Sequence, residues 1–313
     1  MTDERLPLVT IMGPTGVGKT DLAISLAKLV SSEIISVDSV QVYKGMDIGS
    51  GKASKDILDK YPHKLVSFID PWKSYSTALF ILDATREINL CDRSNKVPLL
   101  VGGTMLYFRS LLSGISRMPE ANQEVRNEIS DQAEKYGWGF LHKKLLKVDP
   151  ESAQRIHPND SQRIQRALEV YRVSSKTMTE WRKRDKGSDL VKTKRVIQFA
   201  VEPKSRESLR EDIKTRFLLM LERGLVKEVE KLLDLKQMDL TKSSMKSVGY
   251  RQICDYLEGK STYEEMTAKA VNATRQLAKR QMTWLRKWKN LHWVNQDIEG
   301  ALELIQEKLR LTS

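Results

Sequence analysis

The segment of residues 13–20 constrains the fold of this chain more than any other stretch. It reads Gly-Pro-Thr-Gly-Val-Gly-Lys-Thr, which matches the pattern G-x-x-x-x-G-K-T. The apolar run of residues 6–12 precedes it and predicts a buried strand, and the leucines of residues 21–29 follow with helical spacing. Because this pattern lies between a strand and a helix, it predicts a P-loop, which binds a polyphosphate.

The chemistry of a P-loop gives each part of this segment a role. Its glycines let successive backbone N–H groups point at an anion, and the N-terminus of the following helix adds partial positive charge. Lys19 is expected to reach the outer phosphate, and the Thr20 hydroxyl to ligate Mg²⁺. The motif does not say whose phosphates are bound. The predicted binding residues are Gly13, Pro14, Thr15, Gly16, Val17, Gly18, Lys19 and Thr20.

The 313-residue chain has the composition of a soluble globular protein, with 40% hydrophobic and 30% charged residues. No apolar run approaches the roughly 20 residues of a membrane span, and we expect no signal peptide before the first strand. Cys91 and Cys254 are far apart, which indicates a reducing compartment and argues against a cysteine zinc site. We therefore expect a cytoplasmic protein with no membrane partner, and take a monomer as the starting expectation.

The net charge of +12 is unevenly distributed. Residues 1–120 contain 14 Lys and Arg against 13 Asp and Glu, whereas residues 121–313 contain 39 against 28. This asymmetry indicates a polyanionic partner that binds mainly to the second part of the chain. The alternative is a basic surface that serves only solubility.

Asp38 follows a second predicted strand, residues 33–37. Ligands of open α/β sheets bind beyond the carboxyl ends of the strands, so Asp38 is placed at the same edge as the P-loop. Ser39, Gln41 and Tyr43 add polar groups there. The alternative is that Asp38 only caps the next turn.

A third predicted strand, residues 97–101, ends in Gly102-Gly103-Thr104. The Walker B strand of a nucleotide hydrolase ends in an acidic residue that organises Mg²⁺ and water. The absence of this acid counts against a motor or switch ATPase, and the glycines would let another chain or a ligand approach the backbone closely.

The remaining pattern predicts the domain organisation. Residues 44–75 are expected to form an irregular excursion with little core, and residues 77–90 a helix that buries Leu79, Leu82 and Ile88. From residue 123 to about 184 the pattern is helical, with Asp160 as an N-cap. We predict a P-loop core (1–121), an all-helical insertion (122–185) and a core completion with a basic helical region (186–313).

The last part of the chain returns to the pattern of a sheet with covering helices. Residues 196–201 predict a strand, and in the helix that follows Arg216 lies off the apolar stripe, free to point at a ligand. Trp284 and Trp288, in a long basic helix, are expected to be core residues rather than platforms for bases. The predicted fold class is α/β, a P-loop parallel sheet with helices on both faces and an all-helical insertion domain.

Further segments follow the P-loop in a characteristic order: Asp38-Ser-x-Gln-Val-Tyr43, Gly102-Gly-Thr-x-Leu-Tyr107, Pro119-Glu-Ala-Asn122, His157-Pro-Asn-Asp-x-Gln-Arg-Ile-x-Arg-Ala-Leu-Glu-Val170, Ser247-Val-Gly-Tyr-Arg-Gln252 and Thr274-Arg-Gln-Leu-Ala-Lys-Arg-Gln-x-Thr-Trp-Leu-Arg286. Together they resemble the tRNA dimethylallyltransferases, also called tRNA isopentenyltransferases. Because the cysteines of a C-terminal zinc finger are absent, the chain resembles the bacterial type.

The resemblance implies a reaction. The dimethylallyl group of dimethylallyl diphosphate is transferred to the exocyclic amine of the adenosine 3′ to the anticodon, and the P-loop holds a diphosphate rather than ATP. Asp38 is then the candidate general base. Lys19, Thr20-bound Mg²⁺ and Arg216 would stabilise the leaving diphosphate, and Thr15 would contact the diphosphate or the base.

The resemblance also implies RNA contacts, with the insertion closing over the tRNA anticodon stem-loop and the adenine flipped into a pocket. Two alternatives stay open: a P-loop small-molecule kinase in which Asp38 activates a hydroxyl, and a nucleic-acid-binding ATPase. The implied tRNA-binding residues are Asp38, Ser39, Val40, Gln41, Thr104, Arg126, Gln162, Arg163, Ile164, Gln165, Arg166, Lys246, Ser247, Val248, Gly249, Tyr250 and Arg251.

Overall fold

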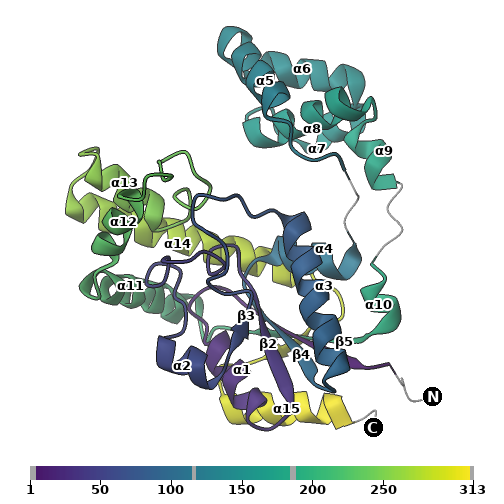
Figure 1. Cartoon of the computed structure of the whole chain (residues 1–313), viewed down its shortest axis with the longest axis vertical. Coiled ribbons are helices and arrows are strands. Elements are labelled where there is room, and N and C mark those ends of the chain that lie inside the picture. Colours follow the sequence, from purple (N-terminus) through teal and green to yellow (C-terminus); the bar gives the residue numbers. More distant parts are fainter. Residues whose placement is uncertain (1–4, 115–117, 184–187, 311–313) are drawn as a thin grey trace. The chain divides into compact units, whose positions relative to one another are not determined.

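The computed structural model describes residues 5–114, 118–183 and 188–310. The chain divides into two compact units (Figure 1). The first, which we call the core unit, combines Met1–Leu112 with Asp189–Ser313, and the second, the insertion unit, is Ser113–Ser188. No helix within the described residues combines the length and the apolar character that a bilayer crossing requires.

A six-stranded sheet forms the centre of the core unit, in the order β3-β2-β4-β1-β5-β6. Every pair of neighbouring strands is parallel, which confirms the predicted fold class. Both Met12 and Val37 pair with Gly102, so the P-loop, Asp38 and Thr104 all follow strands that end at one edge. The strands are β1 (Pro7–Met12), β2 (Ser32–Val37), β3 (His63–Lys64), β4 (Val97–Gly102), β5 (Arg195–Val201) and β6 (His292–Val294).

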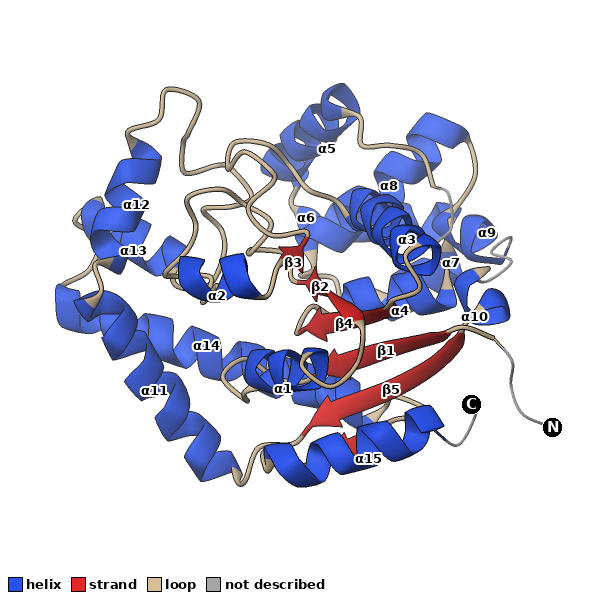
Figure 2. Cartoon of the chain, turned by 60° about the horizontal axis from the view of Figure 1, so that its bottom comes forward, coloured by secondary structure: helices blue, strands red, loops and turns tan. Residues whose placement is uncertain are grey.

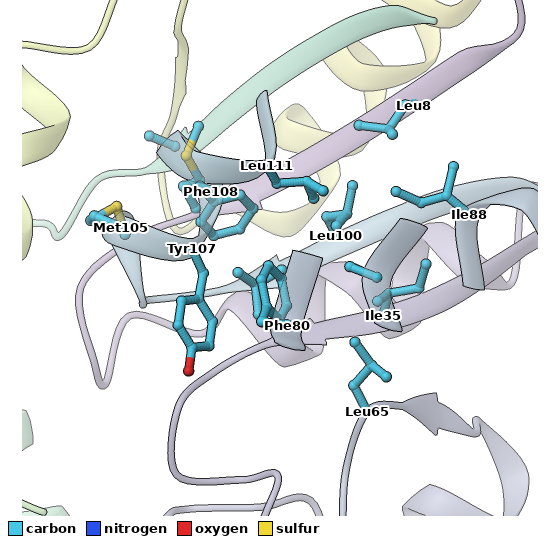
Figure 3. Packing of buried hydrophobic residues seen from close by; sticks show 14 of the residues in the cluster. Leu8, Ile35, Leu65, Phe80, Ile88, Leu100, Met105, Tyr107, Phe108 and Leu111 are labelled. Atoms are coloured by element: carbon cyan, nitrogen blue, oxygen red, sulfur yellow. The ribbon is translucent and has the colours of Figure 1, made fainter. Parts of the chain in front are cut away.

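One face of the sheet packs against α3 (Thr77–Arg93) and α4 (Met105–Ser113) (Figure 3). The rings of Phe80 and Tyr107 stack there, with centroids 4.3 Å apart. The helix 77–90 is confirmed, but the prediction that Leu79 and Leu82 are buried is wrong, since they are 44% and 68% exposed. A neighbouring stripe with the same helical spacing carries the larger Phe80, and burying that ring removes more apolar surface from water. The buried stripe is Phe80, Ala84, Ile88 and Cys91.

The opposite face packs against α1 (Lys19–Ala27) and α15 (Ile298–Arg310) (Figure 2). The alternate residues of β1 explain why both faces are covered. Leu8 and Met12 point to the α3 side, whereas Val9 and Ile11 point to the α1 side, and all four are fully buried. A strand that is apolar on both faces is typical of a parallel sheet.

A third core lies between the excursion after β2 and the helices after β5. The excursion includes α2 (Lys55–Lys60) and β3, and it contributes more core than the sequence predicts, because Met46 is fully buried and Leu65 is buried as well. Gly224, with a φ of 94°, separates α11 from α12. Besides α15, the helices after the insertion are α10 (Leu190–Thr193), α11 (Arg206–Glu222), α12 (Leu225–Leu233), α13 (Tyr250–Leu257) and α14 (Tyr263–Arg286).

Helices make up the regular structure of the insertion unit within its described residues. Asp160 is the N-cap of α8, and its side chain accepts a hydrogen bond from the Arg163 N–H, which confirms that prediction. Ile164, Leu141 and Leu145 are fully buried in the centre of this unit's own core. The helices are α5 (Gln123–Tyr136), α6 (Trp138–Val148), α7 (Pro150–Arg155), α8 (Ser161–Ser174) and α9 (Met178–Lys183).

Candidate active site

A cavity of about 340 Å³ lies in the core unit at the edge where β1, β2 and β4 end. Its wall contains polar groups from the P-loop, from the segments after β2 and β4, and from α11 and α14. Its apolar wall includes Ile213, Phe217 and Trp284. The polar or small lining residues are Thr15, Asp38, Ser39, Gly49, Ser50, Gly103, Thr104, Arg216, Gly249, Thr274, Arg280 and Gln281.

The P-loop adopts a tight conformation around Lys19. Gly16 and Gly18 both have φ of 85°, a region that favours glycine. A Cβ at Gly13 would lie 2.8 Å from the Val17 side chain, so the glycine allows the loop to close. The Lys19 ammonium donates to the Pro14 carbonyl at 2.6 Å. Burial, and secondly the Arg216 charge, lower the pKa of Lys19 to about 8.

Arg216 reaches the P-loop from α11. Its Nη1 donates to the Thr15 hydroxyl at 3.3 Å, and burial lowers the pKa of the guanidinium. A Cβ at Gly51, where φ is 63°, would stand 1.7 Å from Nη2, so the excursion loop needs glycine to pass this side chain. In the described part of the chain neither Lys19 nor Arg216 forms an ion pair. The P-loop lysine and the arginine that contacts the loop are therefore two cations with no carboxylate bound to either.

Asp38 lies on the wall of the same cavity. Its Oδ1 accepts the N–H groups of Val40 at 2.8 Å and Gln41 at 3.2 Å, so the carboxylate does cap a turn. Among the described residues Oδ2 has no hydrogen-bond partner. The capping role and the functional role that we weighed for Asp38 are thus compatible, because they use different oxygens.

The segment after Asp38 is fixed by its own hydrogen bonds. The Ser39 N–H donates to the Thr104 hydroxyl at 3.1 Å, which joins the ends of β2 and β4. The Gln41 side chain accepts from Ser36 at 3.2 Å and donates to the Ser50 carbonyl at 3.4 Å. Ser39, Val40 and Thr104 line the cavity, whereas Gln41 supports the wall from behind.

The segment of residues 246–251 divides between surface and core. Val248 and Gly249 line the cavity, and Lys246 and Arg251 are exposed. Tyr250 is fully buried and its hydroxyl donates to Glu228 at 2.7 Å, so its side chain is a core residue rather than an RNA-facing one.

Two further side chains organise this site and were missed in the sequence. Glu228 accepts the backbone N–H groups of Asp47, Ile48 and Gly49 at 2.7–3.1 Å, which fixes the excursion loop at the cavity. Gln281 bonds to the P-loop and to Gly103. Gln281 lies in the motif of residues 274–286, which drew attention to its segment, whereas no sequence signal pointed to Glu228.

In the insertion unit, the predicted RNA-contacting arginines differ in their partners. Arg163 is 71% exposed and pairs with Asp160 at 3.4 Å. Arg126 and Arg166 both bind the fully buried Glu169, at 2.9 and 2.8 Å. Gln162 is exposed, Gln165 donates to the Arg126 carbonyl and Ser130, and Ile164 is fully buried, so its side chain belongs to the core.

The described residues contain no group of three or more His, Cys, Asp and Glu side chains that could hold a metal ion. Thr20, the second residue of α1, is half-buried beside the P-loop. Mg²⁺ is commonly bound through few protein ligands, with substrate phosphates and waters completing its octahedron. The donor set here fits that mode of binding and does not fit an all-protein cage.

Comparisons with known proteins identify the family. The model of the IPP transferase family matches residues 41–288, and that of the isopentenyl transferases residues 6–63. One similar structure is the tRNA isopentenylpyrophosphate transferase of Bacillus halodurans, with 34% sequence identity, a TM-score of 0.71, and 98% of this chain and 97% of that chain covered. Another is the tRNA Δ(2)-isopentenylpyrophosphate transferase of Staphylococcus epidermidis, with 32% sequence identity, a TM-score of 0.70, and 98% of this chain and 100% of that chain covered. A eukaryotic dimethylallyltransferase acting on tRNA shares the fold, with 24% sequence identity, a TM-score of 0.80, and 98% of this chain and 80% of that chain covered. The chain therefore belongs to the IPP transferase family.

Proposed function

We propose that this protein transfers the dimethylallyl group of dimethylallyl diphosphate to the exocyclic amine of the adenosine 3′ to the anticodon in tRNA. Family membership and the names of the two bacterial relatives support prenyl transfer to tRNA. The observation that carries the proposal is the cavity itself. Its wall combines Thr15 of the P-loop with the Arg216 guanidinium and with Asp38, whose Oδ2 has no partner among the described residues, and Lys19 belongs to the same P-loop.

In this proposal the diphosphate lies on the P-loop, against Lys19 and Arg216. As the bond between the prenyl carbon and the diphosphate oxygen breaks, negative charge grows on the diphosphate, and these cations stabilise it. The adenine nitrogen forms the new bond to that carbon. Its proton passes to Asp38 Oδ2, while Oδ1 stays in the turn.

Mg²⁺ is the proposed metal, with the Thr20 hydroxyl as its protein ligand and diphosphate oxygens and waters as the others. When bound, it would neutralise charge on the leaving diphosphate. Thr15, which Arg216 contacts, would bind the diphosphate or the incoming base.

The tRNA anticodon stem-loop is the proposed macromolecular substrate. Ser39, Val40, Thr104, Val248 and Gly249 line the cavity that would receive the flipped adenine. The exposed Lys246, Arg251, Gln162 and Arg163 are proposed to contact the RNA backbone. Such a substrate is consistent with a monomer in the cytoplasm, and we keep both as part of the proposal.

The kinase and ATPase alternatives are not favoured. Family membership argues against both, and β4 ends in Gly102 and not in a Walker B acid. Incubation with labelled dimethylallyl diphosphate, or with labelled ATP, and bulk tRNA separates the three. Label from the prenyl donor entering RNA supports the proposal, and ATP consumption without prenylated RNA contradicts it.

Asp38→Asn tests the proposed base. An asparagine oxygen still accepts from Val40 and keeps the turn, but the amide cannot take a proton. We expect single-turnover transfer to fall about 10²–10⁴-fold with both substrates still bound. The matched control is Asp56→Asn, an exposed carboxylate on α2. If raised Mg²⁺ restores the rate, Asp38 positions the metal and is not the base.

A further inference from the structure

We infer that Gln281 is a positioning residue that fixes the phosphate-facing Thr15, and with it the conformation of the P-loop. This inference rests on the proposed function, because it concerns the site that would hold the diphosphate. Gln281 lies on α14, 266 residues along the chain from Thr15, and is 8% exposed.

Both polar atoms of the Gln281 side chain have a backbone partner. Oε1 accepts the Thr15 N–H at 2.9 Å, and Nε2 donates to the Gly103 carbonyl at 2.8 Å. One partner can only donate and the other only accept, so a single orientation of the amide satisfies both. Because an unsatisfied buried group is costly, this arrangement holds Thr15 and Gly103 at a fixed separation.

The Gln281 bond changes which P-loop groups face the ligand. In a P-loop, successive N–H groups converge on the anion, but here the Thr15 N–H is occupied by Gln281. The Thr15 hydroxyl accepts from Arg216, so this residue is held from α14 on one side and from α11 on the other. These helices pack together through Leu209, Ile213 and Ala278. The P-loop therefore takes its shape from a helix pair as well as from its own glycines.

Gly103, whose carbonyl accepts the second hydrogen bond of Gln281, also makes room for the Gln281 side chain. A Cβ there would lie 2.5 Å from Gln281 Nε2 and 3.3 Å from the Gly13 carbonyl oxygen. The glycine after β4 thus leaves space for the Gln281 amide between the P-loop and the sheet. Since both its polar atoms are engaged, Gln281 acts through Thr15 and not by direct contact with the substrate.

Gln281→Met is the principal test, because it keeps most of the volume and removes both hydrogen bonds. A misplacement near 1 Å can lower a rate about 10²-fold, and we expect kcat/KM for dimethylallyl diphosphate to fall about 10- to 100-fold. The dissociation constant of Gln281→Met for tRNA should stay within about twofold of the parent. The matched control is Thr283→Ala, an exposed position on the same helix, whose kcat/KM and tRNA affinity should both stay within about twofold of the parent.

A double variant separates positioning from general damage. Gly103→Ala should impair the enzyme by displacing the amide, whereas adding Gln281→Ala removes the clash. We therefore expect the double variant to be no worse than Gln281→Ala alone, a clear departure from additivity. Gln281→Glu should restore the bond to Thr15 but not the one to Gly103, and its added negative charge should weaken diphosphate binding further.

The affinity for inorganic pyrophosphate, measured by calorimetry, makes the result independent of prenyl transfer. If the parent binds pyrophosphate and Gln281→Met binds it at least tenfold more weakly, the positioning role stands even where transfer fails. Parental kcat/KM and parental pyrophosphate affinity in Gln281→Met would overturn the inference. The inference would also be overturned if Gln281→Met lost affinity for tRNA and for pyrophosphate equally and had a lowered Tm, because this result indicates a merely structural role.

Discussion

Lys19 and Arg216 in the core unit form no ion pair within the described residues, whereas Arg126 and Arg166 in the insertion unit both donate to Glu169. The first pair keeps its charge available, and burial without a carboxylate lowers the pKa of both groups. The second pair compensates a carboxylate that is 0% exposed. Cations of the same type are thus left without a carboxylate partner in one region and compensate a buried carboxylate in the other.

The contrast also concerns what a bound polyanion would change. In the core unit a diphosphate would supply the missing negative charge next to Lys19 and Arg216. In the insertion unit an RNA phosphate would compete with Glu169, which also accepts the Asn122 N–H at 2.8 Å. Arg163, 71% exposed and 3.4 Å from Asp160, is held less firmly and is the cation of α8 most available to RNA.

Among substitutions of these cations, Lys19→Met should have the largest effect if the core cations bind the ligand. Removing one group that stabilises developing charge typically lowers kcat about 10²–10³-fold, and we expect a loss of that size in prenyl transfer. tRNA affinity and Tm should be nearly unchanged. Lys28→Met, an exposed position at the end of the same helix, is the control. If Lys19→Met transfers the prenyl group at the parental rate, Lys19 does not contribute to the reaction.

Glu169→Gln tests the opposite role in the insertion unit. Burial alone would raise the pKa of Glu169, but hydrogen bonds from Arg166, Arg126 and the Asn122 N–H lower it overall. The stabilisation is therefore present above the usual carboxyl pKa and is lost as the pH falls through the lower folded value. We expect a loss of about 1–3 kcal/mol at pH 7 in denaturant unfolding, which shrinks in acid.

The control for this substitution is Glu134→Gln, an exposed glutamate on α5. Transfer at saturating tRNA should be the same in Glu169→Gln and the parent below the unfolding temperature. An unchanged stability, combined with tighter tRNA binding, would show that Arg126 and Arg166 are ligand-binding cations that Glu169 merely restrains.

Proton uptake provides a smaller and more specific test of Lys19. Its pKa of about 8 means that the free enzyme already carries the ammonium below pH 8 and loses it above. A bound diphosphate favours the ammonium, so its affinity should fall by up to about tenfold per pH unit above pH 8. Calorimetry in buffers of different ionisation enthalpy should show proton uptake near pH 8.5 in the parent and none in Lys19→Met.

Arg163→Ala should have the smallest effect. Because this side chain is exposed and weakly paired, its loss should leave Tm unchanged, weaken tRNA binding only several-fold and reduce the salt slope of binding by about one. Lys183→Ala, an exposed cation on α9, provides the comparison. A parental salt slope in Arg163→Ala would exclude an RNA phosphate contact at this position.

The sequence predicted the features that follow from local pattern. The P-loop context, the parallel sheet, the shared edge of Asp38 and Thr15, and the N-cap at Asp160 all depend on residues that are close in the chain. It could not predict Glu169 or Gln281, whose roles depend on partners 43 and 266 residues away. A polar side chain that bonds to a distant backbone group leaves no periodicity in the sequence.

Burial of single side chains within a motif was the other feature that the sequence did not predict. Tyr250 and Ile164 belong to segments that resemble RNA-contacting motifs, yet both are fully buried. Motif resemblance assigns a role to a segment, whereas the cores of the two units decide which side chains of that segment are exposed. On α3, two equally spaced stripes competed, and only packing against Tyr107 shows that the one with Phe80 is buried.

The order of the strands has a consequence for synthesis of the protein. The central strand β1 pairs with β4 on one side and with β5 on the other. During translation β1 and β4 can pair early, but β5 emerges only after the whole insertion unit (Ser113–Ser188), whose synthesis takes roughly 4 to 15 seconds at usual elongation rates. Throughout that interval one edge of β1, apolar on both faces, has no partner strand. The nascent chain is then a natural client for chaperones, and a slowly translated insertion would prolong its exposure to aggregation.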